Sequence, residues 1–345
     1  MQKLALLGFG TVGQGLAEIL LQKKAALKAE TGWEGQIVAI SDMMKGSIYD
    51  PNGLDLEKAL SIVKKTGTLD DYPDSEALIR DLDSFETIEQ TNADTIVEVT
   101  FTDVKTGQPA IDHCKAAFAA GKHVVMSNKG PVALAYKDLS QLAKQHGVRW
   151  GFEGTVMSGT PALRMPLTAL AGNDIKEISG ILNGTTNYML LRMEEGLSYE
   201  EALTEAQSLG YAEADPTSDV EGFDARYKIV ILANTVMNAA LKVEDVACDG
   251  ITQITPYDIK KAQEQGKRWK LIARVRKEDG DVKASVQPEM IDKSHPLAQV
   301  QGVLNAVSFN CDLAGNITLS GPGAGRTETG YSLLIDLLNI YRNHI

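Results

Sequence analysis

The stretch Leu4-Ala5-Leu6-Leu7-Gly8-Phe9-Gly10-Thr11-Val12-Gly13 places the pattern GxGxxG directly after a short apolar run. The apolar run predicts a buried strand, and an amphipathic helix is expected from Thr11 to about residue 30. In such a turn Gly8 permits a tight bend, Gly10 lets a pyrophosphate approach the main chain, and Gly13 lets helix and strand pack closely. The free N–H groups at the start of the helix would then hold the phosphates.

This stretch predicts a dinucleotide-binding turn, and a glycine-rich structural turn is the alternative. The candidate cofactor-binding residues are Gly8, Phe9, Gly10, Thr11, Val12 and Gly13. Downstream, strands are expected at 37–40, 95–99, 123–126 and 148–152, and helices at 106–120 and 135–146. Strand–helix alternation favours parallel strands, because a parallel pair needs a crossover that a helix supplies. We therefore expect an α/β fold whose first domain, residues 1–135, is a Rossmann-type doubly wound parallel sheet.

The pattern changes after about residue 153. Strands are expected at 175–182, 270–276, 282–287, 303–310 and 316–320, and helices at 185–195, 198–208, 223–237 and 330–342. A loop rich in acidic residues, glycine and proline is expected at 210–222. This arrangement predicts a second domain of the α+β class with a mixed sheet, over residues 136–324.

The composition of the 345-residue chain is that of an ordinary globular protein, with 43% hydrophobic and 23% charged residues. Its 46 acidic and 34 basic side chains give a formal charge of −12, which disfavours nucleic acids and anionic membrane surfaces as partners. No apolar run reaches 18 residues, and the apolar start ends at Gly8, too early for a signal peptide. Three scattered cysteines suit neither a disulfide framework nor a zinc site. A cytoplasmic location is therefore expected.

Asp42 stands at the end of the second expected strand. A carboxylate there can accept hydrogen bonds from the ribose of a dinucleotide and would repel a 2′-phosphate. The residues that follow are Met43, Met44 and Lys45, without an arginine. This favours NAD over NADP, although Lys45 could still pair with a phosphate. The alternative is that Asp42 is an ordinary turn residue.

Lys129 follows the strand expected at 123–126, within Ser127-Asn128-Lys129. Ligands of an open parallel sheet bind outside the carboxyl ends of its strands, so this lysine would lie at the ligand-binding edge. A lysine at a strand end can also be merely solvated, and position alone does not decide between the two.

Residues 210–228 carry several acids around the start of an expected helix. Asp224 and Lys228 are four residues apart and therefore share one face of that helix. The next residues, Ile229-Val230-Ile231-Leu232-Ala233-Asn234, are almost all apolar, which indicates a largely buried helix. A buried helix rarely carries an aspartate and a lysine unless they pair or take part in chemistry. A capped surface helix with a solvated ion pair is the alternative.

With these segments the sequence resembles homoserine dehydrogenase over essentially its whole length. The segments that carry the resemblance are 8–13, 127–129, 153–161, 210–228, 321–325 and the specific Leu182-Asn183-Gly184-Thr185-Thr186-Asn187-Tyr188. The resemblance implies interconversion of L-homoserine and L-aspartate 4-semialdehyde with NAD or NADP, in threonine, methionine and isoleucine biosynthesis. It also implies a homodimer, with the second domain as the catalytic and dimerisation domain.

The resemblance further implies a role for individual residues. An amine can take the hydroxyl proton of an alcohol and return it to a developing alkoxide, so Lys228 is expected to be the proton donor and acceptor, with Lys129 assisting. Asp224 would orient Lys228 or hold the substrate ammonium group. The expected substrate contacts are Glu213, Asp219, Asp224, Lys129, Tyr211 and Thr185, and the further cofactor contacts are Asp42, Thr100, Lys129, Gly323 and Gly325.

The segment 153–161 resembles the family's site for a sodium or potassium ion. Its oxygen ligands would be the carboxylate of Glu153 and the main-chain carbonyls of Val156, Ser158 and Thr160, and a plain loop is the alternative. The turn at 323–325 resembles one near the family's cofactor, so the C-terminal helix, about residues 325–345, is expected to return to the first domain. Longer relatives carry a regulatory ACT domain or a fused aspartokinase, which the expected short form lacks.

Two other functions fit parts of the sequence. Another Rossmann-fold oxidoreductase could act on a small amino-acid aldehyde. A semialdehyde dehydrogenase, however, needs a nucleophilic cysteine, and none of Cys114, Cys248 and Cys311 lies at a strand end or in a glycine-rich turn that would activate it. A non-catalytic dinucleotide-binding regulator would have no reason to keep Asp224 and Lys228 on one helix face.

Overall fold

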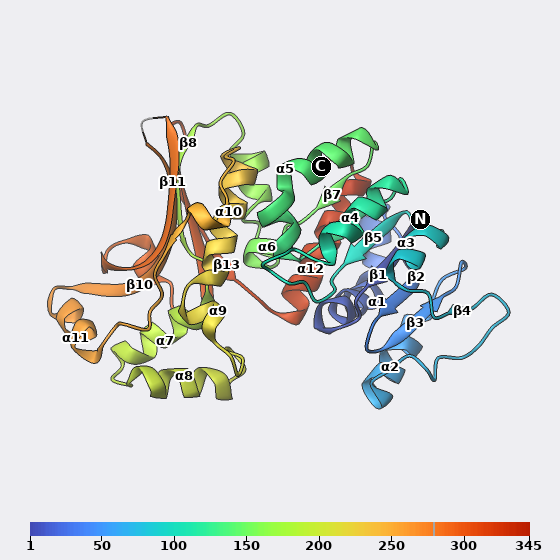
Figure 1. Cartoon of the computed structure of the whole chain (residues 1–345), viewed down its shortest axis with the longest axis horizontal. Helices are drawn as coiled ribbons and strands as arrows, with labels where there is room; N and C mark the ends of the chain where they lie inside the picture. Colours follow the sequence, from blue (N-terminus) through green and yellow to red (C-terminus); the bar gives the residue numbers. More distant parts are fainter. Residues whose placement is uncertain (279) are drawn as a thin grey trace. The chain divides into compact units, whose positions relative to one another are not determined.

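The computed structural model describes residues 1–278 and 280–345 and separates them into two compact units (Figure 1). The first comprises Met1–Gly159 and Gly325–Ile345, and the second comprises Thr160–Ala324. No helix among the described residues combines the length and the apolar character needed to cross a membrane.

The first unit is built on a seven-stranded sheet with the order β4-β3-β2-β1-β5-β6-β7. The strands that pair in parallel are β1 (Gln2–Leu7), β2 (Gly35–Asp42), β5 (Thr95–Glu98), β6 (His123–Met126) and β7 (Trp150–Gly151). In this order β1 lies between β2 and β5, so the strand order reverses beside β1, as in a Rossmann fold. The predicted doubly wound sheet is confirmed.

The segment 46–90 adds elements that the sequence analysis did not predict. Strands β3 (Gly46–Tyr49) and β4 (Ile79–Arg80) extend the sheet in antiparallel pairing, so this edge is mixed and the sheet is not wholly parallel. Helices α2 (Leu56–Thr66) and α3 (Ser84–Gln90) accompany them. Each helix begins after an aspartate, Asp55 or Asp83, whose carboxylate accepts a hydrogen bond from the third helical N–H.

The other helices of the first unit are α1 (Thr11–Thr31), α4 (Ala110–Ala119), α5 (Lys129–Gln145), α6 (Gly154–Met157) and α12 (Arg326–Tyr341). Helix α12 packs against α1 through two glycines. A Cβ on Gly15 would lie 2.4 Å from the carbonyl oxygen of Arg326, and a Cβ on Gly330 would lie 2.8 Å from the main chain of Gly15. This close approach, together with buried leucines such as Leu16 and Leu337, holds the C-terminal helix in the first unit.

The boundary expected after residue 135 is too early. Residue 135 lies inside α5, and β7 follows α5 and pairs in parallel with β6. A strand that belongs to the first sheet keeps the chain in the first unit, which therefore extends to Gly159.

The second unit contains a six-stranded sheet with the order β13-β12-β8-β10-β11-β9. Its strands are β8 (Ile175–Ile181), β9 (Ala247–Cys248), β10 (Lys267–Glu278), β11 (Asp281–Asp292), β12 (Leu304–Cys311) and β13 (Gly315–Pro322). Strand β9 pairs in parallel with β11, and the other pairs are antiparallel, so the predicted mixed sheet is confirmed.

The helices of the second unit are α7 (Gly184–Glu194), α8 (Tyr199–Ser208), α9 (Thr217–Val220), α10 (Phe223–Val236) and α11 (Pro256–Glu264). Short helical turns occur at Met165–Ala169, Val243–Asp245 and Pro296–Gln299. Helix α9 lies in the stretch expected to be a loop. Helix α10 packs on β10 and β11 and is buried from Tyr227 to Thr235, as its apolar sequence predicts. Strand β8 leads directly into α7, so residues 182–183 lie at the end of a central strand.

Candidate active site

The glycine-rich turn between β1 and α1 has the geometry that a pyrophosphate requires. Gly8 adopts φ +95°, and a Cβ there would lie 2.5 Å from the carbonyl oxygen of Val99. A Cβ on Gly13 would lie 2.6 Å from the carbonyl oxygen of Gly8, so helix and turn pack closely. Apart from its chain neighbours, no described residue comes within 4 Å of a Cβ built on Gly10, which begins α1 without a capping side chain. The first N–H groups of α1 are therefore accessible to a phosphate.

Asp42, at the end of β2, holds the same turn. Its Oδ2 accepts a hydrogen bond from the N–H of Phe9 (2.6 Å), and its Oδ1 accepts from the N–H groups of Met44 (2.9 Å) and Lys45 (3.0 Å). The carbonyl of Phe9 accepts a hydrogen bond from the side chain of Gln14 at 2.7 Å. Three main-chain amides thus fix the carboxylate of Asp42 beside the glycine-rich turn.

Thr100 and Lys129 lie near a buried carboxylate, Glu98, which ends β5. Its Oε1 accepts hydrogen bonds from the N–H (2.8 Å) and the hydroxyl (2.6 Å) of Thr100 and from the side-chain amide of Asn128 (2.9 Å). Its Oε2 lies 2.5 Å from Nδ1 of His113. Asn128 immediately precedes Lys129, the half-buried first residue of α5. The two predicted residues therefore flank one polar cluster at the carboxyl ends of β5 and β6.

In the second unit, the side chain of Lys228 is at the centre of a second polar cluster and is 8% exposed. Its Nζ lies 2.7 Å from Oδ2 of Asp224, one helical turn earlier on α10, and donates a 2.7 Å hydrogen bond to the carbonyl of Leu182. The side-chain amide of Asn183 donates to Asp219 (2.6 Å) and to Asp224 (3.1 Å). The end of β8, the short helix α9 and the first turns of α10 thus bring an amine and two carboxylates together.

The electrostatics of this cluster favour a positively charged ligand. Burial raises the pKa of Asp219, and the neighbouring carboxylate of Asp224 raises this pKa further. The hydrogen bond from Asn183 and the charge of Lys228 lower the pKa but do not restore its ordinary value. An added cation next to Asp219 would relieve this repulsion.

Other predicted substrate contacts lie around the same loop. The hydroxyl of Thr185, on α7, donates to the carbonyl of Tyr211 at 2.6 Å, and the ring of Tyr211 packs edge-on against that of Tyr188 with centroids 5.1 Å apart. Glu213 is exposed, and its main-chain carbonyl accepts a hydrogen bond from Gln207 at 3.1 Å. Within the described residues, the structure does not bring its carboxylate into contact with the Lys228 cluster.

The expected cation ligands are distributed over both units. Glu153, Val156 and Ser158 are buried in the first unit, and Thr160 is the first residue of the second. The N–H of Glu153 donates to Asp336 of α12 at 2.9 Å. Ser158 adopts φ +54°, a conformation that costs a non-glycine residue about 1 kcal/mol and that is found preferentially at functional sites.

The late glycine-rich turn is divided between the units. Gly323 lies against Asn305 of β12 in the second unit, where a Cβ on the glycine would be 2.2 Å from the amide nitrogen of Asn305. Asn305 is buried, and its side-chain amide has no hydrogen-bond partner among the described residues. Gly325 precedes α12 with φ +143°. The next residue, Arg326, forms a largely exposed ion pair with Glu18 of α1 at 2.7 Å.

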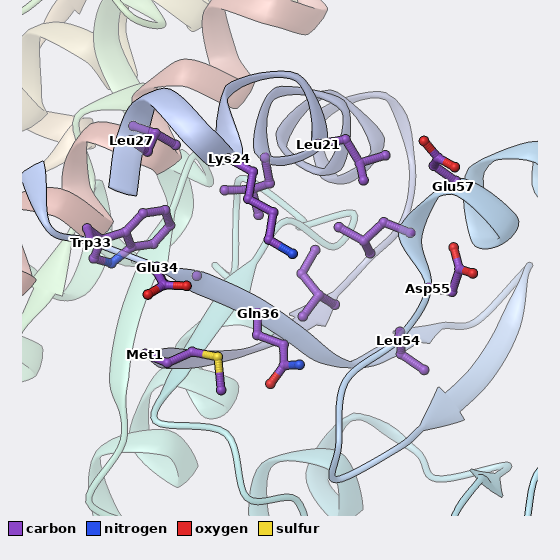
Figure 2. A pocket seen from close by; sticks show the side chains of 14 residues that line it. Met1, Leu21, Lys24, Leu27, Trp33, Glu34, Gln36, Leu54, Asp55 and Glu57 are labelled. Carbon is purple, nitrogen blue, oxygen red and sulfur yellow. The ribbon is translucent and has the colours of Figure 1, made fainter. Parts of the chain in front are cut away.

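A hollow of about 290 Å³ occurs at a different place on the first unit (Figure 2). The residues around it include Met1, Leu21, Lys24, Trp33, Gln36 and Leu54. Met1 and Gly35 stand at the amino ends of β1 and β2, opposite the edge that carries the glycine-rich turn. Because ligands of such sheets bind at the carboxyl ends of the strands, this hollow is separate from the cofactor site.

Sequence reasoning missed several polar residues of these clusters. Asn183 lies in the segment 182–188 but was given no role, although an asparagine before a helix is a recognisable signal. Glu98 stands in an otherwise apolar strand, which also marks it as unusual. His113 and Asn305 carried no local signal, because the residues that they lie against, Glu98 and Gly323, are distant in the sequence.

Two family models and several known proteins match the chain. The family model described as Homoserine dehydrogenase matches residues 161–338, and one described as Glutamate/Leucine/Phenylalanine/Valine dehydrogenase matches residues 1–104. An NAD(+)-dependent homoserine dehydrogenase of Pseudomonas canavaninivorans is 45% identical, over 99% of this chain and 96% of its own. A homoserine dehydrogenase of Methanocaldococcus jannaschii is 43% identical, over 98% of each chain.

Solved structures are similar over the same length. A crystal structure from Archaeoglobus fulgidus has a TM-score of 0.89 and 41% identity, covering 99% of both chains. A hyperthermophilic archaeal homoserine dehydrogenase in complex with NADPH has a TM-score of 0.85 and 32% identity, covering 99% of this chain and 98% of its own. The chain belongs to the homoserine dehydrogenase family.

Proposed function

We propose that Lys228 exchanges the hydroxyl proton of the substrate in the reaction of this homoserine dehydrogenase, the interconversion of L-homoserine and L-aspartate 4-semialdehyde with NAD or NADP. The observation that carries the proposal is the buried side-chain nitrogen of Lys228, which lies 2.7 Å from Asp224 and 2.7 Å from the carbonyl of Leu182. When bound, the nicotinamide ring supplies the hydride acceptor or donor. In oxidation the uncharged amine of Lys228 takes the hydroxyl proton and becomes an ammonium, and in reduction this ammonium returns the proton to the developing alkoxide.

A lysine in this position suits both directions. Removal from water makes it easier for an amine to release a proton, and a carboxylate at hydrogen-bond distance makes it easier to recover one. An amine in such a setting can do both without moving. The carbonyl of Leu182 and the carboxylate of Asp224 fix the direction of the Lys228 side chain. Lys129, on the first unit, is proposed to assist.

We assign the acidic groups of the second unit to the ammonium group of the substrate. The raised pKa of Asp219 means that its charge is poorly compensated by the protein alone, and a substrate ammonium would compensate it. Asp224 and Glu213 would contribute further negative charge. Thr185 and Tyr211, which hydrogen-bond to each other, would border the substrate.

We further propose that NAD is preferred over NADP. Asp42 has a fixed carboxylate that would repel a 2′-phosphate, and the exposed side chains of Met43 and Met44 carry no charge to neutralise one. The 45% identical relative from Pseudomonas canavaninivorans is named NAD(+)-dependent, although the archaeal relative is in complex with NADPH.

Three more proposals concern the surroundings of the site. The oxygens of Glu153, Val156, Ser158 and Thr160 would hold a sodium or potassium ion, as the buried Glu153 and the strained Ser158 suggest. Two chains would form a homodimer through the second unit, whose edge strand β13 offers a long row of hydrogen-bonding groups to a partner. The protein would work in the cytoplasm, where its free cysteine thiols suit the reducing conditions.

The role of Lys228 is tested by comparing the parent with Lys228→Met, by the absorbance of the reduced nicotinamide with L-homoserine and either cofactor. We expect kcat to fall by about 10²–10⁴-fold, since general acid–base groups contribute this much, with the Kd for NAD nearly unchanged. Lys260→Met, which removes an exposed lysine on α11, is the matched control. A Lys228→Met variant within a few-fold of the parent would refute the assignment.

A further inference from the structure

We propose that Glu98 and His113 form a buried positioning pair, which fixes Thr100 and the turn at Asn128–Lys129 at the ligand-binding edge of the first unit. The proposal rests on the proposed function in one respect, the assisting role of Lys129. It assigns no proton transfer to either residue: both act through the groups that they hold.

Glu98 is placed where the parallel strands present their ligand-binding ends. It is fully buried at the end of β5, with Leu7 of β1 on one side and Met126 of β6 on the other. A carboxylate offers about four acceptor positions, and the donors of Thr100, Asn128 and His113 fill them. Removing one donor would therefore leave a buried acceptor without its partner.

His113 is held on the other side of this carboxylate. It lies on α4, is 3% exposed, and contacts Glu98 through Nδ1 at 2.5 Å. Its ring packs edge-on against Phe85, with centroids 5.1 Å apart. Packing and hydrogen bonding together fix the imidazole, which in turn fixes the direction of the Glu98 carboxylate.

Asn128 links the Glu98 carboxylate to the start of α5. It occupies the position before the helix, whose third residue, Pro131, has no N–H to donate to a capping side chain. Here the side chain makes no such cap and donates to Glu98 instead. The residue that precedes Lys129 is therefore tied to Glu98 through its side chain.

Thr100 connects the pair to the glycine-rich turn. Both its N–H and its hydroxyl donate to Glu98, so the turn after β5 is fixed at two points. The same turn lies against Gly8, where an added Cβ would be 3.0 Å from the nitrogen of Thr100. One carboxylate thus anchors the turns that follow β5 and β6, and the turn that follows β1 rests on the first of them.

The test compares variants that differ in one hydrogen bond. His113→Leu removes the donor to Glu98, whereas His113→Asn keeps an N–H near the position of Nδ1. Asn128→Ala, at a half-buried position, removes only the hydrogen bond between Glu98 and the residue that precedes Lys129. The measurements are amide hydrogen exchange of residues 99–102 and 127–131 without cofactor, kcat and KM for L-homoserine, and the isotope effect on kcat with substrate deuterated at carbon 4.

We expect faster exchange in both segments for His113→Leu and in residues 127–131 for Asn128→Ala. For both variants kcat should fall about 10- to 100-fold, as small misplacements cause, with KM changed less than about threefold and a larger isotope effect. His113→Asn should restore most of the exchange protection and of kcat, which a merely space-filling role would not explain.

The proposal is overturned if His113→Asn is no better than His113→Leu, or if Asn128→Ala keeps the exchange and kcat of the parent. Lys129→Met, measured alongside, separates this result from the proposed function. If Lys129→Met has the kcat of the parent, the assisting role of Lys129 fails, and the exchange data still decide whether Glu98 and His113 hold the turns. If Lys129→Met is slow and Asn128→Ala is not, only the positioning pair is refuted.

Discussion

The side-chain amide of Asn183 donates a hydrogen bond to Asp219 over 2.6 Å. The same amide group donates to Asp224, and its oxygen caps α7 by accepting from the N–H of Thr186 at 2.9 Å. Asn183→Asp keeps the oxygen that caps α7. It replaces the NH2 group that donates to Asp219 and Asp224 with an oxygen, and so adds a third carboxylate to the cluster. We expect kcat/KM for L-homoserine to fall about 10- to 100-fold, because a hydrogen bond to a charged group contributes about 1.5–3 kcal/mol.

Steady-state kinetics and thermal unfolding at several pH values check this prediction. The added repulsion should raise the pKa of Asp219 beyond its already raised value. A carboxyl group whose pKa is raised by folding stabilises the folded state below its unfolded pKa, and this contribution is lost as the pH rises. The variant should therefore lose more stability than the parent between mildly acidic and neutral pH. Asn310→Asp, on an exposed position of β12, is the control.

Local patterns predicted the parts of the fold that depend on near neighbours. The β1–α1 turn was predictable because its glycines act within six residues, and the Asp224–Lys228 contact because one helical turn separates the two. The segment 46–90 was missed because β4 has two residues and α2 and α3 are set mainly by their caps. Helix α5 starts at Lys129 and is kinked at Ala135, where φ is −137°, so the start expected near residue 135 coincides with the kink inside the helix.

The candidate site was predictable only in part for the same reason. Asn183 meets Asp219 36 residues later, and Glu98 meets His113 15 residues later, on separate elements. Such contacts depend on which elements the fold places side by side, and no spacing rule contains that information. The sequence singled out Asp219, Asp224 and Lys228, but it did not single out Asn183, Glu98 and His113, which contact residues on other elements.

The carboxylate of Asp42 has two separable effects. Asp42→Ala removes the acceptor for the N–H groups of Phe9, Met44 and Lys45. The glycine-rich turn is then no longer held in place, which should weaken the binding of both NAD and NADP. It also removes the group proposed to bind the ribose and repel a 2′-phosphate. We expect the Kd for NAD to rise about 10-fold or more and the Kd for NADP to rise less, measured by fluorescence titration. If the binding of NAD and NADP weakens equally, Asp42 only holds the turn and does not discriminate between the two cofactors.

The exposed carboxylate of Glu213 is predicted to act in binding and not in proton transfer. Glu213→Gln should raise KM for L-homoserine about 10-fold, with kcat changed little, because a charged hydrogen bond to the ammonium is lost. Asp215→Asn is a matched control, since Asp215 is exposed on the same loop and its carboxylate accepts hydrogen bonds from Thr217. An unchanged KM for Glu213→Gln would remove this residue from the substrate contacts.

Lys270 makes the stability of the second unit depend on pH. It is 2% exposed on β10, and its Nζ donates to the side-chain oxygen of Asn187 (2.7 Å) and to the carbonyl of Val300 (2.6 Å). Burial is the main cause that lowers its pKa from 10.5 to about 8; the charge of Glu194 opposes this shift, and the charge of Arg268 contributes to it. Between pH 8 and 10.5 the unfolded chain therefore holds a proton at this position that the folded chain has released.

Stability must rise with pH wherever the unfolded state binds more protons, by about 1.4 kcal/mol per pH unit for one group. Lys270→Met lacks this contribution, so the unfolding temperature of the parent relative to Lys270→Met should increase from pH 8 to pH 10. Thermal unfolding at half-unit steps of pH measures the difference, and Lys260→Met, an exposed lysine, should show none. Below pH 8 Lys270 is protonated in both the folded and the unfolded chain. The difference in unfolding temperature between the parent and Lys270→Met should therefore become constant. A difference that is flat across the whole range would mean that Lys270 stays charged in the folded protein and that its two acceptors fully compensate its burial.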